Sequence, residues 1–378
     1  MRILFLYEGY DEYTVQLWNN IRNKNPHARM SLLTTKGSEE KYKARIDLRD
    51  GEQIYTELDR WAWFPISSLF AIRSMPHFDI IHITYMELKW GILASTLKRK
   101  CDKLIISVGG GDLYESSVKL RKRIILSRLV RRANLISSEN TQTRKKFSEI
   151  YKIQSRNTEH RIVRYGVNVI DAINCHNGDN IVSVKKKWGI PTDRIIVMLG
   201  HNGFRQHQHL KMIEAVGKME SDVLDRCFFV IPMTYGVSSG EYKNEVKDAI
   251  SQLTDKYVIL EKFLNVDQMA EITMMTDIMI HIQTSDQLSS TMMAHLYNGN
   301  VVLAGSWLPY DDIKKAGIRI FDIDSVYELT EKLKDAVKRL DEYKSLCTRN
   351  RDAVYCFSSW EACVDSWMDM YDTVINEK

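Results

Sequence analysis

The sequence has little of what marks disordered or membrane-spanning proteins. Six prolines and 18 glycines are spread over 378 residues without a biased tract, which excludes collagen-like and linker-dominated chains. No apolar run reaches the roughly 20 residues that a membrane-spanning helix needs. The short apolar run Ile3–Leu6 is soon followed by Glu8, so we expect no secretory signal and a cytoplasmic location.

Cysteines are few and scattered. The six thiols form no CxxC pair and have no histidine beside them at metal-ligand spacing, so we expect neither disulfides nor a bound metal, and no cofactor. The net charge is only +4. No nucleic-acid motif is present, and the most basic segment lacks interleaved aromatics, so nucleic acid is not expected as a partner.

Short apolar runs alternate with segments of helical periodicity, a pattern typical of parallel strands joined by helices. The sequence predicts strands in the first half at 2–7, 30–35, 79–84, 103–108, 134–138 and 161–164. In the second half it predicts strands at 194–199, 227–232, 257–261, 278–282, 301–304 and 318–321, followed by helices at 326–344 and 358–375. The chain is therefore predicted to be an α/β protein of two doubly wound, Rossmann-like domains facing across a cleft, with C-terminal helices.

The domain limits follow from the same pattern. We predict an N-terminal domain at 1–166, a linker at 167–187, a second domain at 188–350 and a terminal helix at 351–378 that packs back across the domains. The linker is placed where NCHNGDN and a lysine run interrupt the apolar periodicity. Ligands of such sheets bind beyond the carboxyl ends of the strands, so the cleft is the expected site.

Two polar turns follow strands of the first half. One contains Gly109, Gly110 and Gly111 before Asp112, where glycines allow a sharp turn and the close approach of a ligand. A plain turn with Asp112 as an N-cap is the alternative. The spacing is not GxGxxG, which disfavours a dinucleotide site. The other turn begins at Glu8 and is acidic, which does not suit phosphate.

The strand at 194–199 runs into GHNGFRQHQH. Gly200 and Gly203 expose backbone N–H groups, Asn202 lies between them, and Arg205 and His209 add basic groups near a helix N-terminus. This combination is typical of an anion site. A surface turn with a solvated arginine and a capping asparagine is the alternative.

Two later turns carry further polar side chains. The segment VIPMTYG ends a strand with Tyr235 beyond it, and IHIQTSDQLSST runs from a strand into a helix. Hydroxyl-rich turns often serve only as helix caps. Here they offer several donors at the same sheet edge as Arg205, which favours contact with phosphate or sugar. The candidate residues of the second turn are Thr284, Ser285, Asp286, Gln287, Ser290 and Thr291.

In this order the segments resemble GT-B glycosyltransferases. GHNGFRQHQH, VIPMTYG with EYKNEV, and DQLSST before NGNVV resemble more narrowly the bacterial 4-acetamido-4,6-dideoxygalactose (TDP-Fuc4NAc) transferases, which act on lipid-linked acceptors. The resemblance implies a nucleotide-sugar site in the second domain and an acceptor site in the first. The donor would be a UDP-, GDP- or dTDP-sugar.

By position, the resemblance implies a set of residues that hold the donor diphosphate: Gly200, Asn202, Gly203, Arg205 and His209. Asp286, Gln287, Ser290 and Thr291 would contact its phosphate or sugar, and Phe263, in the loop KFLN, would lie near the base and ribose. The chain departs from many retaining GT-B enzymes, because it has no glutamate pair in Ser285–Ala294 and has Asn300 where proline is common. The stereochemistry therefore stays open.

Transfer of a sugar requires stabilisation of the leaving diphosphate, and GT-B enzymes typically use cations and helix dipoles in place of a metal. Arg205 and His209 are the candidates. If the reaction inverts configuration, Asp112 or Glu8 is the available base; if it retains, the leaving phosphate serves.

The segment Lys119–Lys146 holds ten cations and one acid, Glu139. Apolar residues alternate with its cations at helical spacing, as in a helix that lies on an anionic membrane. A crossover helix with a solvated basic face is the alternative.

Together with these observations, the resemblance implies a metal-independent glycosyltransferase of hexosyltransferase type, peripheral at the cytoplasmic face of the cell membrane. It would transfer a sugar to a lipid-linked or glycan acceptor of a bacterial surface polysaccharide, such as O-antigen, capsule or an enterobacterial common antigen-like polymer. A nucleotide-sugar epimerase of the same fold and a catalytically silent sugar-binding module are the alternatives. The sequence does not specify the sugar, the acceptor or the oligomeric state.

Overall fold

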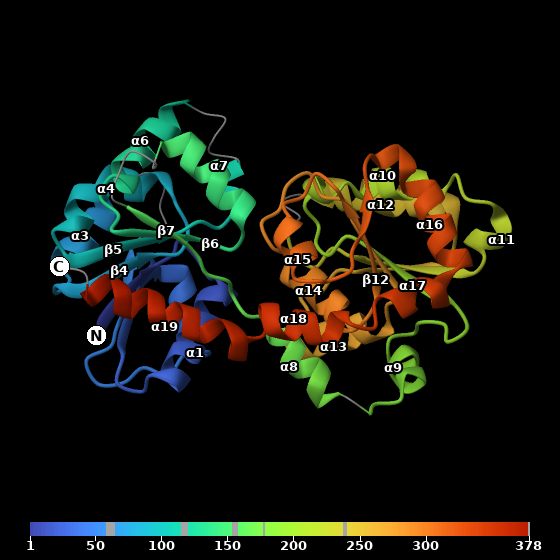
Figure 1. Ribbon diagram of the computed structural model, residues 1–378, viewed down its shortest axis with the longest axis horizontal. Helices are drawn as coiled ribbons and strands as arrows, with labels where there is room; N and C mark the ends of the chain where they lie inside the picture. The colour runs from blue at the N-terminus through green and yellow to red at the C-terminus, as the bar shows by residue number, and fades with distance from the viewer. Residues whose placement is uncertain (58–64, 115–119, 153–157, 177, 237–239, 377–378) are drawn as a thin grey trace. The chain divides into compact units, whose positions relative to one another are not determined.

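The structure is a computed structural model that describes residues 1–57, 65–114, 120–152, 158–176, 178–236 and 240–376. The chain forms two units, each an α/β body (Figure 1): unit 1 comprises Met1–Gly166 and Trp360–Lys378, and unit 2 comprises Val167–Ser359. Lys119, the first residue of the predicted basic segment, lies outside the described residues.

Unit 1 is built on a parallel sheet, which in the described residues has seven strands in the order β3-β2-β1-β4-β5-β6-β7. The strands are β1 (Arg2–Leu6), β2 (Arg29–Thr35), β3 (Ile54–Glu57), β4 (Phe78–Ile83), β5 (Cys101–Ser107), β6 (Leu135–Ser138) and β7 (Glu159–Ile162). The helices are α1 (Glu12–Lys24), α2 (Glu39–Lys43), α3 (Ile66–Ser74), α4 (Leu88–Lys98), α5 (Gly111–Tyr114), α6 (Leu120–Val130), α7 (Thr141–Tyr151) and α19 (Trp360–Asn376), with the 3-10 turn η1 (Lys36–Ser38). The strand order reverses at β1, which puts the turns after β1 and β4 at the topological switch point.

Unit 2 repeats the plan with six strands in its described residues, in the order β10-β9-β8-β11-β12-β13. These are β8 (Ile195–Leu199), β9 (Cys227–Pro232), β10 (Tyr257–Leu260), β11 (Ile278–His281), β12 (Val301–Gly305) and β13 (Phe321–Ile323). The helices are α8 (Asn168–Cys175), α9 (Ile181–Lys187), α10 (His209–Val216), α11 (Ser221–Leu224), α12 (Gly240–Leu253), α13 (Val266–Met275), α14 (Ser290–Tyr297), α15 (Asp311–Lys315), α16 (Leu329–Lys338), α17 (Leu340–Leu346) and α18 (Asn350–Ser358), with η5 (Arg205–His207) and η6 (Val326–Glu328). Its switch point lies between β8 and β11.

The predicted doubly wound α/β class is confirmed in both units. Strand β3 was not predicted, because its four residues, IYTE, contain only two large apolar side chains and form a sheet edge. The helix predicted at 326–344 is divided into η6, α16 and α17, with Arg339 at the break between the two α-helices.

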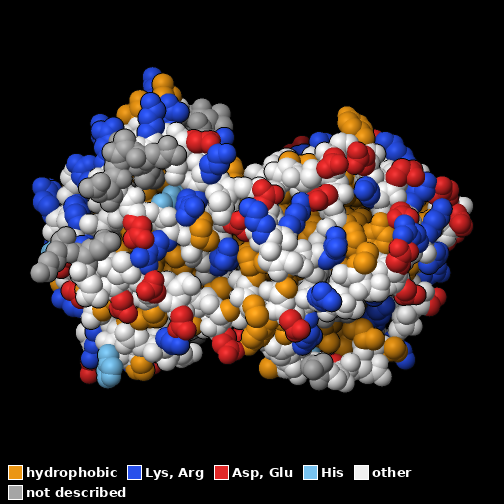
Figure 2. Space-filling model, viewed as in Figure 1, with side chains coloured by type: hydrophobic (Ala, Val, Ile, Leu, Met, Phe, Trp, Pro, Cys, Tyr) orange, Lys and Arg blue, Asp and Glu red, His pale blue; other side chains and the backbone are white. Residues whose placement is uncertain are grey.

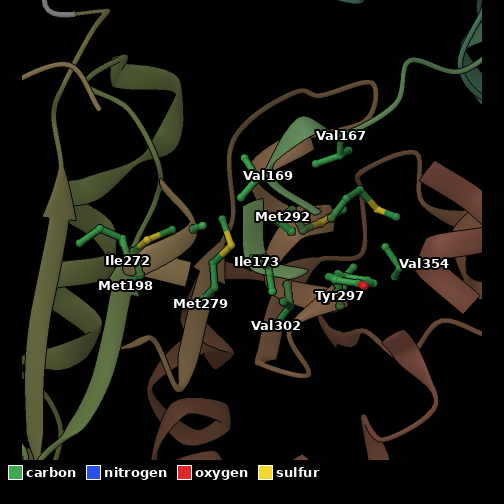
Figure 3. Packing of buried hydrophobic residues seen from close by; sticks show 14 of the residues in the cluster. Val167, Val169, Ile173, Met198, Ile272, Met279, Met292, Tyr297, Val302 and Val354 are labelled. Atoms are coloured by element: carbon green, nitrogen blue, oxygen red, sulfur yellow. The ribbon is translucent and has the colours of Figure 1, made fainter. Parts of the chain in front are cut away.

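The segment 167–187 is not a linker. It forms α8 and α9, and the apolar side chains of α8 are buried in the core of unit 2. Figure 3 shows Val169 and Ile173 of α8 beside Met292 and Tyr297 of α14. The prediction of a linker failed because α8 is only eight residues long. Its few apolar residues are too short a stretch to show helical periodicity in the sequence.

The predicted single helix at 351–378 is two helices. Ser359 has an extended backbone and separates α18, which packs in unit 2, from α19, which belongs to unit 1. Helix α19 is amphipathic and buries Trp367, Met370 and Tyr371 against one face of the unit 1 sheet. None of the helices in the described part of the chain combines the length and hydropathy that crossing a bilayer requires.

Candidate functional site

The turn after β8 is held in one conformation by its glycines and by the turn after β9. Gly200 has a φ of +68°, and a Cβ on it would lie 2.9 Å from Nε2 of His209, so another residue would be strained there. Gly203 N donates to the carbonyl of Tyr235 at 2.7 Å. The Asn202 amide accepts from Phe204 N at 3.0 Å and lies 3.4 Å from the Tyr235 hydroxyl. The predicted residues of these two turns are thus brought together.

Arg205 lies beside this turn and is largely exposed, with 59% of its side chain accessible. Its guanidinium forms two bonds with the Glu245 carboxylate, at 2.9 and 2.5 Å, and lies 4.4 Å from the ring centroid of Tyr242. The cation is therefore positioned by α12 and remains accessible to a ligand. Glu245 was not predicted, and it competes with any anion for Arg205.

His209 does not supply a positive charge in this structure, contrary to the prediction. It is the first residue of α10 and is fully buried, and its Nδ1 lies 3.2 Å from the Tyr242 hydroxyl. Burial lowers the pKa of His209 to about 4, because desolvation disfavours the charged imidazole. It is therefore neutral near pH 7, and Arg205 is the cation of this turn.

A small cavity of about 50 Å³ opens at the carboxyl edge of the unit 2 sheet. The predicted residues Tyr235, Phe263 and Thr291 line it, together with His201 and His295, which were not predicted. Phe263 is 71% exposed. An exposed aromatic ring at such an edge offers a stacking surface for a ligand.

The turn after β11 joins the same region. Thr284 N donates to the carbonyl of Gln206 at 2.9 Å. Asp286 accepts from the Tyr310 hydroxyl and lies 3.5 Å from Nε2 of His281. Burial alone would raise the pKa of Asp286, but the bonds from His281 and Tyr310 outweigh it and lower the pKa. Asp286 is thus a carboxylate held by protein partners.

The remaining predicted residues of this turn are placed by the start of α14. Ser289 is its N-cap and accepts from Met292 N at 3.2 Å. Ser290 and Thr291 form the first turn of the helix, Gln287 is buried before it, and Ser285 is half-buried. Ser289 therefore serves as the helix cap. Thr291 does not cap the helix and lines the cavity. Asn300 has a structural role, because its amide donates to the carbonyl of Thr273 at 2.8 Å.

In unit 1, Glu8 follows β1 and contacts a buried lysine. Lys89 is 1% exposed, and its Nζ lies 2.9 Å from Glu8, 3.3 Å from Glu87 and in contact with Glu57. A hydrogen bond from Glu87 lowers the pKa of Glu8, whereas burial and that same bond raise the pKa of Glu87 to about 9. The two carboxyls therefore share one proton, and Glu8, 49% exposed, is the ionised and accessible member.

Asp112 is not accessible as a base, contrary to the prediction. It is fully buried, and its two oxygens accept from the backbone N–H groups of Met86, at 2.9 Å, and Gly109, at 3.0 Å. Burial raises the pKa of Asp112 to about 6. Its bonds instead tie the turn after β5 to the turn after β4.

The glycines of this loop have a packing role. A Cβ on Gly109 or Gly111 would lie 2.8 or 3.0 Å from the side chain of Tyr85. Gly110 has a φ of +86°. The predicted acceptor-side loop therefore needs glycine for its own folding, whatever else it contacts.

Within the described residues, no group of three or more His, Cys, Asp or Glu side chains is arranged to hold a metal ion. Metal independence stays a prediction.

Solved structures match the whole length of the chain. HepE from Anabaena, in complex with UDP and glucose, has a TM-score of 0.76 at 12% identity and covers 99% of this chain and 100% of its own. A glycosyltransferase from Rickettsia africae has a TM-score of 0.79 at 14% identity over 100% and 99%. Sucrose-phosphate synthase from Thermosynechococcus elongatus has a TM-score of 0.75 at 10% identity over 99% of both chains.

The chain has the GT-B fold. The predicted architecture is thereby confirmed, and the turns after β8, β9 and β11 lie at the carboxyl edge of the second GT-B domain. No protein-family model matches the sequence, and the search of curated proteins gave no match.

Sequence reasoning missed two groups of this GT-B chain. His201, His207 and His281 lie close together beside His209, and Lys89 gathers three carboxylates. A signal existed for the first, because three histidines occur within nine residues after one strand and His281 ends the neighbouring strand. No signal existed for the second, because Glu8, Glu57 and Lys89 are far apart in the sequence.

Proposed function

We propose that the protein is a glycosyltransferase that transfers a sugar from a nucleotide-sugar donor to a lipid-linked or glycan acceptor of a bacterial surface polysaccharide. The observation that carries the proposal is the cavity of unit 2, where Tyr235, Phe263 and Thr291 meet beside the Gly200–Gly203 turn. An aromatic wall next to a glycine turn and an accessible arginine suits a nucleoside diphosphate.

The donor would bind with its base against Phe263 and its diphosphate near Arg205. Loss of the sugar leaves negative charge on the diphosphate, which the Arg205 guanidinium stabilises. HepE was crystallised with UDP and glucose, and a similar trehalose-phosphate synthase from Burkholderia xenovorans is UDP-forming. These similarities support UDP among the three candidate nucleotides, whereas the resemblance to TDP-Fuc4NAc transferases supports dTDP.

The acceptor would bind to unit 1, with Glu8 as its base if the reaction inverts configuration. Glu8 is ionised and exposed, and Lys89 and Glu87 fix its position. A carboxylate of lowered pKa is a weak base, but it accepts a proton from a hydroxyl whose acidity rises as the glycosidic bond forms.

A lipid-linked acceptor requires access to a membrane, and we propose that α6 provides it at the cytoplasmic face. Its exposed side chains are the apolar Leu120 and Ile124 and the cationic Arg121 and Arg128. Figure 2 shows Lys and Arg side chains gathered over α6. An apolar and cationic surface of this kind fits anionic headgroups.

The first test is a donor and acceptor screen. UDP-, GDP- and dTDP-sugars are added to the protein with and without lipid-linked acceptors, and nucleoside diphosphate release is measured in the presence of EDTA. We expect release that requires both substrates and resists EDTA. Release without acceptor, or binding of a donor without turnover in any combination, would contradict transfer; loss of turnover in EDTA would contradict only metal independence.

The matched variants are Arg205→Ala and Arg339→Ala. Arg339 is also an exposed arginine of unit 2 that pairs with a glutamate, Glu342, and lies near a tyrosine ring, Tyr343. We expect Arg205→Ala to lower turnover by about 100-fold or more, and Arg339→Ala to leave it unchanged. Equal activity of the two variants would remove Arg205 from the site.

A further inference from the structure

Four histidine rings lie together beneath the turn after β8. The ring centroids of His201 and His207 are 4.3 Å apart at 83°, and those of His201 and His281 are 5.6 Å apart and nearly parallel. His209 completes the group at 5.8 Å from His207. We call these four residues the histidine cluster. His201 is its partly exposed member and lines the cavity, whereas the other three are fully buried.

Ring nitrogens of the histidine cluster lack hydrogen-bond partners within the described residues. They are Nδ1 of His201, both nitrogens of His207 and Nδ1 of His281. His207 is 0% exposed. A buried polar atom without a partner destabilises the fold, so nitrogens of this kind gathered in one place point to a ligand or water that satisfies them.

Several charged and titratable groups of the described residues lie around the cluster. The turn after β11 contributes Asp286, α14 contributes His295, and α12 contributes Tyr242 with the Arg205–Glu245 pair beyond it. The turn after β9 contributes Tyr235, and Tyr310 bonds to both His281 and Asp286. Asp286 is the carboxylate that faces the cluster directly, at 3.5 Å from His281.

The geometry favours an anion over a metal ion. No three of these side chains are arranged around a common point that a cation could occupy. Nε2 of His209 and Nδ1 of His207 instead lie 2.9 and 3.3 Å from the position of a Cβ on Gly200. They therefore face the backbone of the turn at which, under the proposed function, the donor diphosphate binds.

We propose that the histidine cluster takes up a proton when the diphosphate of a nucleotide sugar binds at the turn after β8. The inference rests on the proposed function and adds to it a dependence of donor affinity on pH. The proton comes from solvent. It resides on His201 or on His207, whose ring contacts the ring of His201. A protonated imidazole then adds a second cation to Arg205 at the diphosphate.

The pKa values of His201 and His207 agree with uptake of a proton on binding. Burial lowers the pKa of His201 to about 3 and that of His207 well below its ordinary value, so both are neutral near pH 7. A doubly negative diphosphate beside a buried imidazole favours the charged form. Binding and protonation therefore stabilise each other, and the affinity rises as the pH falls.

The test is calorimetric titration of the full chain with UDP-, GDP- and dTDP-sugars at pH 6 and pH 8, each in two buffers of different ionisation enthalpy. A nucleotide sugar is used because the terminal phosphate of a free nucleoside diphosphate itself titrates near pH 6. We expect proton uptake on binding and a Kd that rises up to about tenfold per pH unit for each proton taken up.

The variants are His201→Gln and His207→Gln, with His27→Gln, an exposed histidine of unit 1, as the matched control. We expect the uptake and the pH dependence to be lost in at least one cluster variant and kept in the control. Donor binding by the wild type without uptake, or uptake that persists in both cluster variants, would overturn the inference and leave the proposed function intact. Absence of binding of every donor at both pH values would instead overturn the proposed function. The wild-type measurement decides the matter even if a variant does not fold.

Discussion

The indole of Trp360 lies directly against the α-carbon of Gly166, so that a Cβ on this glycine would lie 2.3 Å from the ring. Gly166 is the last residue of unit 1 before the chain enters unit 2, and Trp360 is the first after it returns. The chain therefore leaves unit 1 and re-enters it at two residues that contact each other.

We expect Gly166→Ala to lower the free energy of unfolding by about 1–3 kcal/mol, because the added methyl group overpacks a buried contact. Urea unfolding monitored by tryptophan fluorescence measures the change. Gly240→Ala is the control, since a Cβ there meets nothing within 4 Å and alanine favours a helix. A Gly166→Ala variant as stable as the control would contradict the prediction. It would show that Trp360 and α19 move to accommodate the methyl group without a loss of stability.

Buried neutral histidines predict a loss of stability in mild acid. His82 bonds to Tyr371 and Ser107 through its two nitrogens, at 2.8 and 2.7 Å, and burial lowers its pKa to about 3. The unfolded chain binds a proton near pH 6.5, which the folded chain does not. The free energy of unfolding should therefore fall between about pH 6.5 and 3, by about 1.4 kcal/mol per pH unit for each such histidine.

The measurement is the urea midpoint at pH 7.5 and pH 5.5. His160, His201 and His295, whose pKa values are also lowered to about 3 by burial, add to the effect. We expect His82→Gln to weaken the pH dependence and the exposed His27→Gln to leave it unchanged. Equal midpoints at the two pH values would refute the prediction.

The sheets were predictable because their strands are apolar runs such as CFFVIP, in which every residue is buried. The positions of the polar turns were predictable from the sequence. The functions of their side chains were not. Asp112 and Glu8 both follow strands, and only their neighbours distinguish them: backbone N–H groups enclose Asp112, whereas Glu8 meets Lys89 at 2.9 Å. Such long-range contacts leave no local pattern in the sequence.

We expect Glu245→Gln to tighten donor binding. Glu245 pairs with Arg205 at the surface, where such pairs contribute at most about 1 kcal/mol. Removing its charge frees the guanidinium and eliminates a repulsion, so the Kd for a nucleotide sugar should fall by about 2–5-fold. Calorimetric titration measures the change, and Glu342→Gln, which frees Arg339, is the matched control. Unchanged affinity in Glu245→Gln would indicate that Arg205 does not contact the donor.

The carboxyl pair of unit 1 predicts a pH profile. We expect Glu8→Gln to lower kcat by about 100-fold or more, because it removes the proposed base. Glu87→Gln should keep activity near pH 7, since an amide donates a hydrogen bond to Glu8 as the protonated carboxyl does. It should also abolish the change in kcat that we expect of the wild type near pH 9, because burial raises the pKa of Glu87 to about 9. If kcat of Glu87→Gln still changes near pH 9, a group other than Glu87 causes the change.

The cationic face of α6 predicts binding to anionic vesicles. Arg121 and Arg128 are exposed, and their double reversal to glutamate should weaken sedimentation with phosphatidylglycerol vesicles by at least about 2 kcal/mol, or roughly 30-fold. Reversal of Lys211 and Lys218, two exposed lysines of unit 2, is the control. Equal binding of the two variants would exclude α6 as the membrane contact.

The contribution of α19 to unit 1 sets an order of events during synthesis. All residues of unit 2 leave the ribosome before Trp367 and Tyr371, which cover Phe5 and His82 of the first domain's sheet. Until then the first half of the nascent chain has an uncovered apolar face, while unit 2 already has its whole sequence. We therefore expect unit 2 to reach its native state first, and chaperones that bind exposed apolar surface to be released from unit 1 only after α19 has been synthesised.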